Sequence, residues 1–157
     1  MPQFHNQNRQ QGGAQNQPLS LDPKYIQTLQ DGYFDSSGNM KCELITTLAE
    51  QVARDLAFKG KVSTAQLRGF FGHVRAVERE LEYSEFAVII PSIQKLEPLA
   101  AYYVGRGSNQ YEKNERKLLK QFIDLNVQCA QKGKREFKEG LVIHFQSVVA
   151  YHKFVSR

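Results

Sequence analysis

Apolar residues in this chain recur mainly every three or four positions, which is the spacing of one buried helical face. Between residues 40 and 58 the repeat is strict, with apolar side chains at Leu44, Leu48, Val52 and Leu56. This pattern predicts a helix from about Met40 to Phe58, ended by Gly60 as a C-terminal cap.

A second helix is predicted from Ser63 to Leu81. Ser63 is a favourable N-cap residue, and Gln66 three positions later completes a capping box. The apolar face of this helix consists of Leu67, Phe70, Phe71, Val74, Val77 and Leu81. Two glycines, Gly69 and Gly72, interrupt it, and each costs about 1 kcal/mol relative to alanine.

Residues 84–105 are apolar and predict helix, with a kink or a division into two short helices because of Pro91 and Pro98. A strand at "FAVIIP" is the alternative, because β-branched residues favour strands. Helix is preferred, since no partner strand is evident elsewhere in the sequence.

Two long helices are predicted in the C-terminal third. The first runs from about Gln110 to Gln131 and ends before Gly133. The second runs from about Lys134 to Val155 and is interrupted by Gly140. Its inward face consists of Phe137, Leu141, Phe145, Val148 and Val155.

The N-terminal part is less periodic. A short segment near Pro23–Gln30 is followed by a loop at residues 35–39. Residues 1–20 are rich in Gln and Asn, and Arg9 is their one charged residue, so they lack the apolar groups needed to offset the entropy of ordering. We therefore expect a disordered tail at residues 1–20 and one all-α domain, a small bundle of about five helices, at residues 21–157.

Composition is that of a soluble globular protein, with 41% hydrophobic and 24% charged residues. The formal net charge of +5 is unevenly distributed. From Arg106 to the end there are 11 basic and 5 acidic residues, whereas the preceding residues hold 10 and 11. This asymmetry suggests a polyanionic partner, most simply a nucleic acid, and a merely solvated basic surface is the alternative.

Candidate catalytic and metal-binding residues are few. Cys42 and Cys129 are far apart and form no CxxC pair, and the four histidines lack metal-ligand spacing. There is no phosphate-binding loop and no nucleophile elbow, so we expect no enzyme, metal or cofactor; a small ribonuclease using His144 or His152 is the weakest hypothesis. Without an apolar run that suits a signal peptide or a membrane span, the sequence indicates a cytoplasmic protein with reduced thiols.

Basic residues gather on one face of the predicted helix 110–131 and at the turn after it. The helix contributes Lys113, Arg116, Lys117 and Lys120, and the turn contributes Lys132, Lys134 and Arg135. Their density favours phosphate contact. Glu112 and Asp124 lie four residues from Arg116 and Lys120, so a solvated face with helix salt bridges is the alternative.

Three arginines, Arg68, Arg75 and Arg79, fall within a narrow arc of the predicted helix 63–81. Arg75 and Arg79 have glutamates at helical spacing, Glu78 and Glu82, but Arg68 has none. Gly72 lies beside the arginines, where a missing side chain lets a phosphate backbone approach. Gly69 lies away from them, where it suits helix–helix contact, and close packing alone explains both glycines equally well.

Three segments resemble, in the same order, motifs of one family. "STAQLRGFFGHV" resembles the S/T-x-x-[IL]-R-x-[FI] helix of the small subunit of the type III-A CRISPR (Csm) interference complex. "LEPLAAYYVGR" resembles that family's LKPKLAYAxGR segment, and "FQSVVAYHKF" resembles its C-terminal [FY]-x-E-A-[IV]-V-A-[YF]-H-K-[FY] signature. Glu97 and Leu99 replace the usual lysines around Pro98, and Ser147 stands near the usual Glu.

The resemblance implies a small helical, non-catalytic subunit. Several copies would stack along guide RNA and target RNA, in contact with one another and beside the backbone subunits and the large polymerase-like subunit. Arg68 matches the arginine of the family's motif, so the arginines and lysines named above are expected to hold RNA phosphates without reading its sequence. A helical adaptor that binds only protein is the alternative.

Overall fold

The computed structural model describes residues 19–156. Residues 1–18 of the predicted tail lie outside this range. The described residues are mostly helical and contain no β-sheet, so the predicted all-α bundle is confirmed. The α-helices are α1 (Pro23–Gln30), α2 (Thr47–Arg54), α3 (Thr64–Leu81), α4 (Phe86–Gln94), α5 (Leu96–Gly105), α6 (Gln110–Ala130) and α7 (Val142–Val155).

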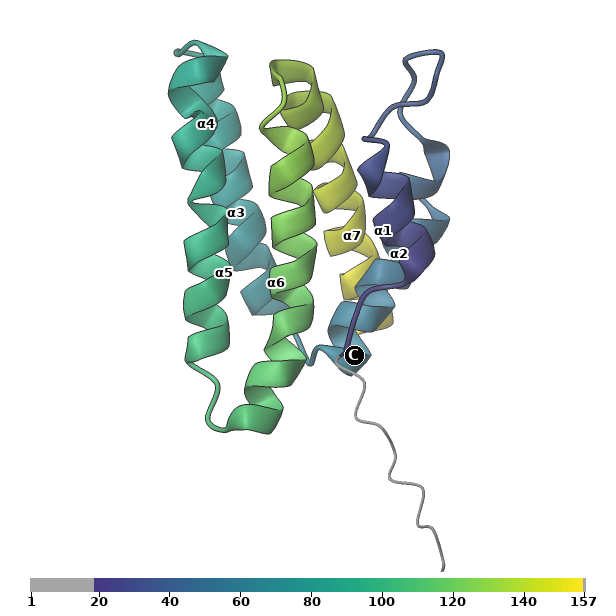
Figure 1. Ribbon diagram of the computed structural model, residues 1–157, viewed down its shortest axis with the longest axis vertical. Coiled ribbons are helices and arrows are strands. Elements are labelled where there is room, and N and C mark those ends of the chain that lie inside the picture. Colours follow the sequence, from purple (N-terminus) through teal and green to yellow (C-terminus); the bar gives the residue numbers. More distant parts are fainter. Residues whose placement is uncertain (1–18, 157) are drawn as a thin grey trace, which may run out of the picture.

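The long helices stand side by side along the long axis of the molecule (Figure 1). α6 packs against α5 and α1, and α7 packs against α2 and α3. The α5–α6 loop lies at one end of the bundle, the lower end in Figure 1, and the α6–α7 turn lies at the other. The predicted number of about five helices differs from the structure mainly because residues 84–105 divide and residues 23–30 form a helix of their own.

The helix predicted from Met40 begins later than its apolar pattern indicates, so this boundary is wrong. Met40 lies in an isolated β-bridge, and a single 3-10 turn, η1 (Cys42–Leu44), precedes α2. Leu44 is fully buried from this turn, which explains why the four-residue spacing continues across residues that are not α-helical. At its other end α2 continues into a π-helical segment, η2 (Asp55–Lys59), and Gly60 caps it as predicted.

The apolar stretch at residues 84–105 forms the two short helices α4 and α5, and the alternative of a strand is wrong. The division falls at Lys95 rather than at a proline. Pro91 lies inside α4, whereas Pro98 is the third residue of α5, where the backbone nitrogen needs no helical acceptor.

The start of α3 is the capping box that the sequence predicts. The backbone N–H of Gln66 donates to the hydroxyl of Ser63 at 3.1 Å, and the N–H of Ser63 donates to the side-chain oxygen of Gln66 at 2.9 Å. These two hydrogen bonds satisfy two of the backbone donors that the first turn of a helix leaves free.

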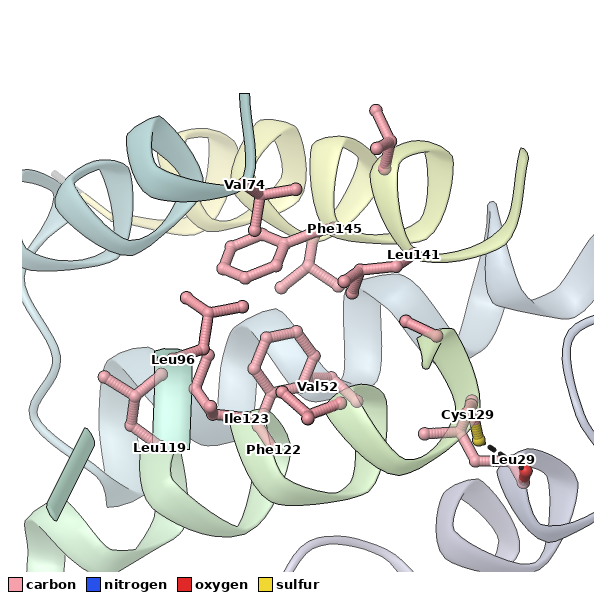
Figure 2. Close-up of a cluster of buried hydrophobic side chains, with 14 of the residues drawn as sticks. Leu29, Val52, Val74, Leu96, Leu119, Phe122, Ile123, Cys129, Leu141 and Phe145 are labelled. Carbon is pink, nitrogen blue, oxygen red and sulfur yellow. Dashed lines mark hydrogen bonds between the residues drawn. The ribbon is translucent and has the colours of Figure 1, made fainter. Parts of the chain in front are cut away.

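One hydrophobic cluster connects the helices. Figure 2 shows Val74 of α3 and Phe145 of α7 facing Phe122 of α6, and the rings of Phe122 and Phe145 meet edge to face at 5.1 Å between centroids. Burying each such side chain contributes about 1.5–3 kcal/mol. Of the residues predicted to face inward, Phe70, Phe71 and Val155 are half-buried instead.

The predicted helix 134–155 is continuous, but its first part is the π-helical segment η3 (Glu136–Leu141), which α7 follows directly. Gly140 is buried in η3 against the ring of Tyr33, and a Cβ at this position would overlap that ring. The interruption at Gly140 therefore allows a close approach between η3 and Tyr33.

A polar network is buried between α1, α6 and α7. The hydroxyl of Tyr25 donates to Nε2 of His144 at 2.7 Å and accepts from Nδ2 of Asn126 at 3.0 Å. Nδ1–H of His144 donates to the carbonyl of Leu44 at 2.6 Å, and the hydroxyl of Tyr33 donates to Oδ1 of Asn126 at 2.8 Å. Burial lowers the pKa of His144 to about 4, so the ring is neutral near pH 7.

Candidate functional site

The outer face of α3 carries an open strip at the two glycines. Among residues 19–156, no atom outside their own helical turns lies within 4 Å of the position that a Cβ would take on Gly69 or Gly72. The helix–helix contact expected at Gly69, and close packing within the chain at either glycine, are therefore wrong. Both glycines leave backbone exposed on the surface of the molecule.

The three arginines of α3 differ in their surroundings. Arg75 pairs with Glu78 at 2.7 Å, as the sequence predicts, and its guanidinium lies 5.2 Å from the ring centroid of Phe71. Arg68 and Arg79 are exposed, and neither forms an ion pair in the described part of the chain. The pair that spacing allows between Arg79 and Glu82 is not formed. Arg68 and Arg79 are thus available to an external anion.

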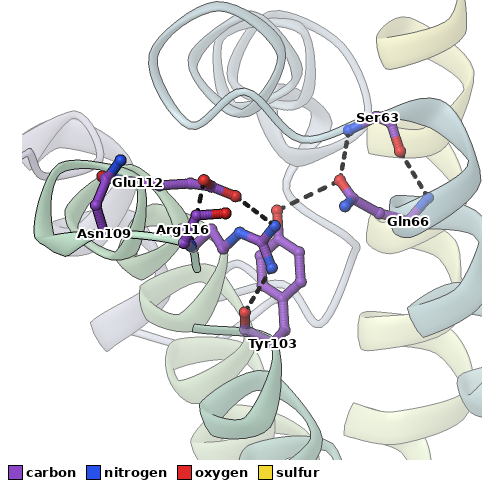
Figure 3. Close-up of polar contacts among 7 residues, drawn as sticks. Ser63, Gln66, Tyr103, Asn109, Glu112 and Arg116 are labelled. Atoms are coloured by element: carbon purple, nitrogen blue, oxygen red, sulfur yellow. Dashed lines mark hydrogen bonds and ion pairs between the residues drawn. The ribbon is translucent and has the colours of Figure 1, made fainter. Parts of the chain in front are cut away.

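Arg116 on α6 has internal partners (Figure 3). It donates to Glu112 at 2.7 Å and to the backbone carbonyl of Tyr103 at 2.8 Å, and its side chain is 18% exposed. The predicted pair of Lys120 with Asp124 is also formed, at 2.5 Å. These contacts favour a structural role for Arg116 and partial neutralisation of Lys120.

The remaining basic residues of α6 are Lys113 and Lys117, and neither forms an ion pair with any described residue. Lys117 is exposed, whereas Lys113 is half-buried and its stem packs against Gly107 in the α5–α6 loop. Lys117 is therefore the more accessible of the two.

At the other end of α6, Lys132 and Lys134 are exposed. Arg135 pairs with Glu139 at 2.9 Å, lies 3.9 Å from the ring centroid of Phe34 and donates to the carbonyl of Gly38. Arg135 thus fixes the loop around residues 35–39 against the start of η3.

The predicted basic residues do not form a single patch. α6 has 21 residues, so Lys113 and Lys132 lie about 30 Å apart, near opposite ends of the bundle (Figure 1). Arg68 lies in the second turn of α3, and the pocket that Gly69 lines together with Arg106 and Arg116 does not include it.

Sequence reasoning did not select Arg106, Tyr102 or Gln66 as site residues, although all three line this pocket. Arg106 is exposed and, among the described residues, forms no ion pair. The signal was present, because "LEPLAAYYVGR" ends in this arginine. Its spacing alone gave no reason to place it beside α3.

The candidate catalytic histidines have structural partners. Both nitrogens of His144 are hydrogen-bonded in the interior, and Nε2–H of His152 donates to the carbonyl of Val62 at 2.9 Å. Burial lowers the pKa of His152. The described residues contain no group of three or more His, Cys, Asp or Glu side chains that suits a metal ion. None of the helices within 19–156 has the length and apolar content to cross a membrane.

The three motif segments are joined through α3. Tyr103 donates to the side chain of Gln66 at 3.4 Å, which joins the "LEPLAAYYVGR" segment to the start of α3. His152 contacts Val62, next to the N-cap of α3, and the rings of Phe71 and Phe145 lie 5.3 Å apart. The segments that resemble family motifs therefore form one contact region.

The comparison that decides the assignment is a family model, Csm2 Type III-A, which matches residues 39–157. The chain belongs to the Csm2 family. The match covers the helices from α2 to α7 and all three motif segments. No curated protein and no solved structure matches the chain. Membership in the Csm2 family makes this chain a structural subunit of a type III-A CRISPR complex.

Proposed function

We propose that this chain is a non-catalytic RNA-binding subunit that holds guide RNA and target RNA by their phosphates, as one of several copies in a type III-A complex of the cytoplasm that acts in antiviral defence. The observation that carries the proposal is Arg68, which lies in the family-like motif, is exposed and has no ion-pair partner among residues 19–156. Phosphate contact without base-reading pairs suits a protein that must accept any guide sequence.

The surroundings of the basic residues divide them into two groups. Arg68, Arg79, Lys117, Lys132 and Lys134 are exposed and unpaired within the described chain, and we assign phosphate contact to them first. The others have an internal partner or are half-buried, and they would act by adding positive charge; they are Arg75, Lys113, Arg116, Lys120 and Arg135.

An apolar surface supports contact with the other subunits, which we take to be neighbouring copies, backbone subunits and the polymerase-like subunit. Ile45, Tyr151 and Phe154 line an open cleft beside α7, and Phe154 is 74% exposed. Exposed apolar groups gathered in this way are typical of a protein-binding surface.

The test of RNA binding is the salt dependence of the affinity for a single-stranded RNA. Arg68→Ala is expected to weaken binding equally for unrelated sequences and to reduce the slope of log affinity against log salt by about one. Arg54→Ala is the matched control, because this substitution removes the same charge. Arg54 is exposed on α2 and already pairs with Glu50 at 3.0 Å. Equal effects of the two variants would show non-specific attraction and would contradict a phosphate site at Arg68.

A further inference from the structure

A pocket of about 360 Å³ lies between α3 and α5, near the end of the bundle that holds the α5–α6 loop. It is lined by Gly69 and Phe70 from α3 and by Leu99 and Tyr102 from α5. Its volume is at the lower end of the range of about 300–1,000 Å³ that small-molecule sites occupy. Tyr102 is 67% exposed, so an aromatic face is accessible to a ligand.

The charge of this pocket has one sign. Arg106 and Arg116 line it, and no Asp or Glu does. Arg116 is neutralised by Glu112, but Arg106 has no ion-pair partner among residues 19–156, and its guanidinium lies 5.7 Å from the ring centroid of Tyr102. A planar aromatic group that carries a negative charge beside it matches such a lining.

The wall of the pocket is fixed before any ligand arrives. The ring of Tyr103 meets Phe70 edge to face at 5.9 Å and lies under the guanidinium of Arg116, and its hydroxyl reaches Gln66 (Figure 3). Gln66 is itself held in the capping box with Ser63. Gly69 adds no side chain, so the space above the helix backbone stays open. A ligand would therefore bind without the cost of ordering these side chains.

We propose that this pocket receives one unstacked base of a single RNA strand, with the base against Tyr102 and an adjacent phosphate at Arg106. The inference rests on the proposed function and adds a base-binding site to the phosphate contacts. RNA is favoured over an apolar side chain of a protein partner because cations border the aromatic groups. Stacking on an aromatic ring accepts every base, which agrees with a subunit that accepts any guide.

The test compares two ligands of equal charge, a short single-stranded oligoadenylate and an abasic oligonucleotide of the same length, binding to the full-length protein. The wild type is expected to bind the oligoadenylate about tenfold more tightly, since stacking of one base contributes on this scale. Tyr102→Ala and Gly69→Leu should remove this preference without changing affinity for the abasic strand. Gly69→Leu extends a side chain into the pocket from an exposed helical site where a Cβ has no neighbouring atom within 4 Å, so we expect the fold to be retained.

Ala76→Leu is the matched control, because it adds the same bulk to the exposed face of α3 two turns away from the pocket. It should bind both ligands as the wild type does. Equal binding of the two ligands by the wild type would overturn the base pocket. Weaker binding by Arg68→Ala in that experiment would still support the proposed function, whereas no binding of either ligand at any salt would overturn both.

Solution mass measurements distinguish a protein occupant. If Gly69→Leu abolishes self-association while the preference for the base-bearing strand persists, a second copy of the chain occupies the pocket and the inference is wrong. If self-association is unchanged and the preference is lost, the base is the occupant.

Discussion

The guanidinium group of Arg116 lies 4.6 Å from the ring centroid of Tyr103 and donates a hydrogen bond to the backbone carbonyl of that same residue. Through these contacts the arginine connects α5 to α6 across the loop between them, and its ion pair to Glu112 lies within α6. Burial raises the pKa of Tyr103, which keeps the phenol neutral under the cation.

Arg116→Ala is therefore expected to reduce the free energy of unfolding by roughly 1–2 kcal/mol, the value of a charged hydrogen bond and a cation–π contact. Urea denaturation measures this change. Arg68→Ala should unfold at the same urea concentration as the wild type, because it breaks no side-chain hydrogen bond or ion pair among the described residues. A reversed order of the two variants would contradict the structural role of Arg116.

Two helical glycines should respond in opposite ways to the same substitution. Gly140→Ala places a methyl group on the ring of Tyr33 and is expected to destabilise by about 1–3 kcal/mol. Gly69→Ala meets no neighbour and is expected to stabilise by up to about 1 kcal/mol, because alanine favours the helix. Thermal melts of both variants test the pair. Two changes of the same sign would contradict the surroundings described for either Gly140 or Gly69.

Stability is expected to fall at acidic pH because of His144. Its pKa is about 4 in the folded protein and about 6.5 in an unfolded chain, so the unfolded state binds more protons between these values. The stabilisation is complete above about pH 6.5 and is lost as the pH falls toward 4, a change on the order of 3 kcal/mol. The lowered pKa of His152 acts in the same direction. Urea midpoints measured between pH 6.5 and pH 4 give the slope of stability against pH.

His144→Gln is the control for the pH profile. It should be less stable than the wild type near pH 7, since Tyr25 and Leu44 lose well-placed partners. Its stability should also depend less on pH between 6.5 and 4, because the titrating group is gone. An unchanged slope would assign the acid sensitivity to other residues.

Removal of residues 1–18 is expected to leave the melting temperature within about 2 °C of the wild type, because their composition lacks the apolar groups of a packed segment. The comparison variant also lacks residues 19–21. Leu21 is buried and its N–H donates to Gln121 at 2.8 Å, so this longer deletion should melt clearly lower. A large loss from the shorter deletion would show that the tail contributes to stability.

The sequence predicted the helical elements well, because a repeated apolar face and a capping box such as Ser63–Gln66 are local signals. It failed at Met40, since the burial of Leu44 from a 3-10 turn produces the same spacing as a helix. Val155 was expected to face inward beside Val148, but it is half-buried at the end of α7.

The candidate site was harder to predict, because a helical phase shows which side chains are exposed but not what they meet. Arg116 and Arg135 reach partners 13 and 97 residues away, and no local spacing reveals those contacts. Gly69 and Gly140 look alike in the sequence, yet one faces open space and the other faces the ring of Tyr33. Such differences arise only when the helices pack.

The π-helical segment before α7 has a consequence for how the length of this chain can change. A π turn holds about one residue more than an α turn. Deletion of one residue within Glu136–Leu141 therefore lets an ordinary α turn form while Phe145 and Val148 keep facing the core. The same deletion in the middle of α3 rotates everything beyond it by about 100° and carries Val77 and Leu81 away from the interior. Single-residue gaps among related chains are thus expected at η3 and not within α3.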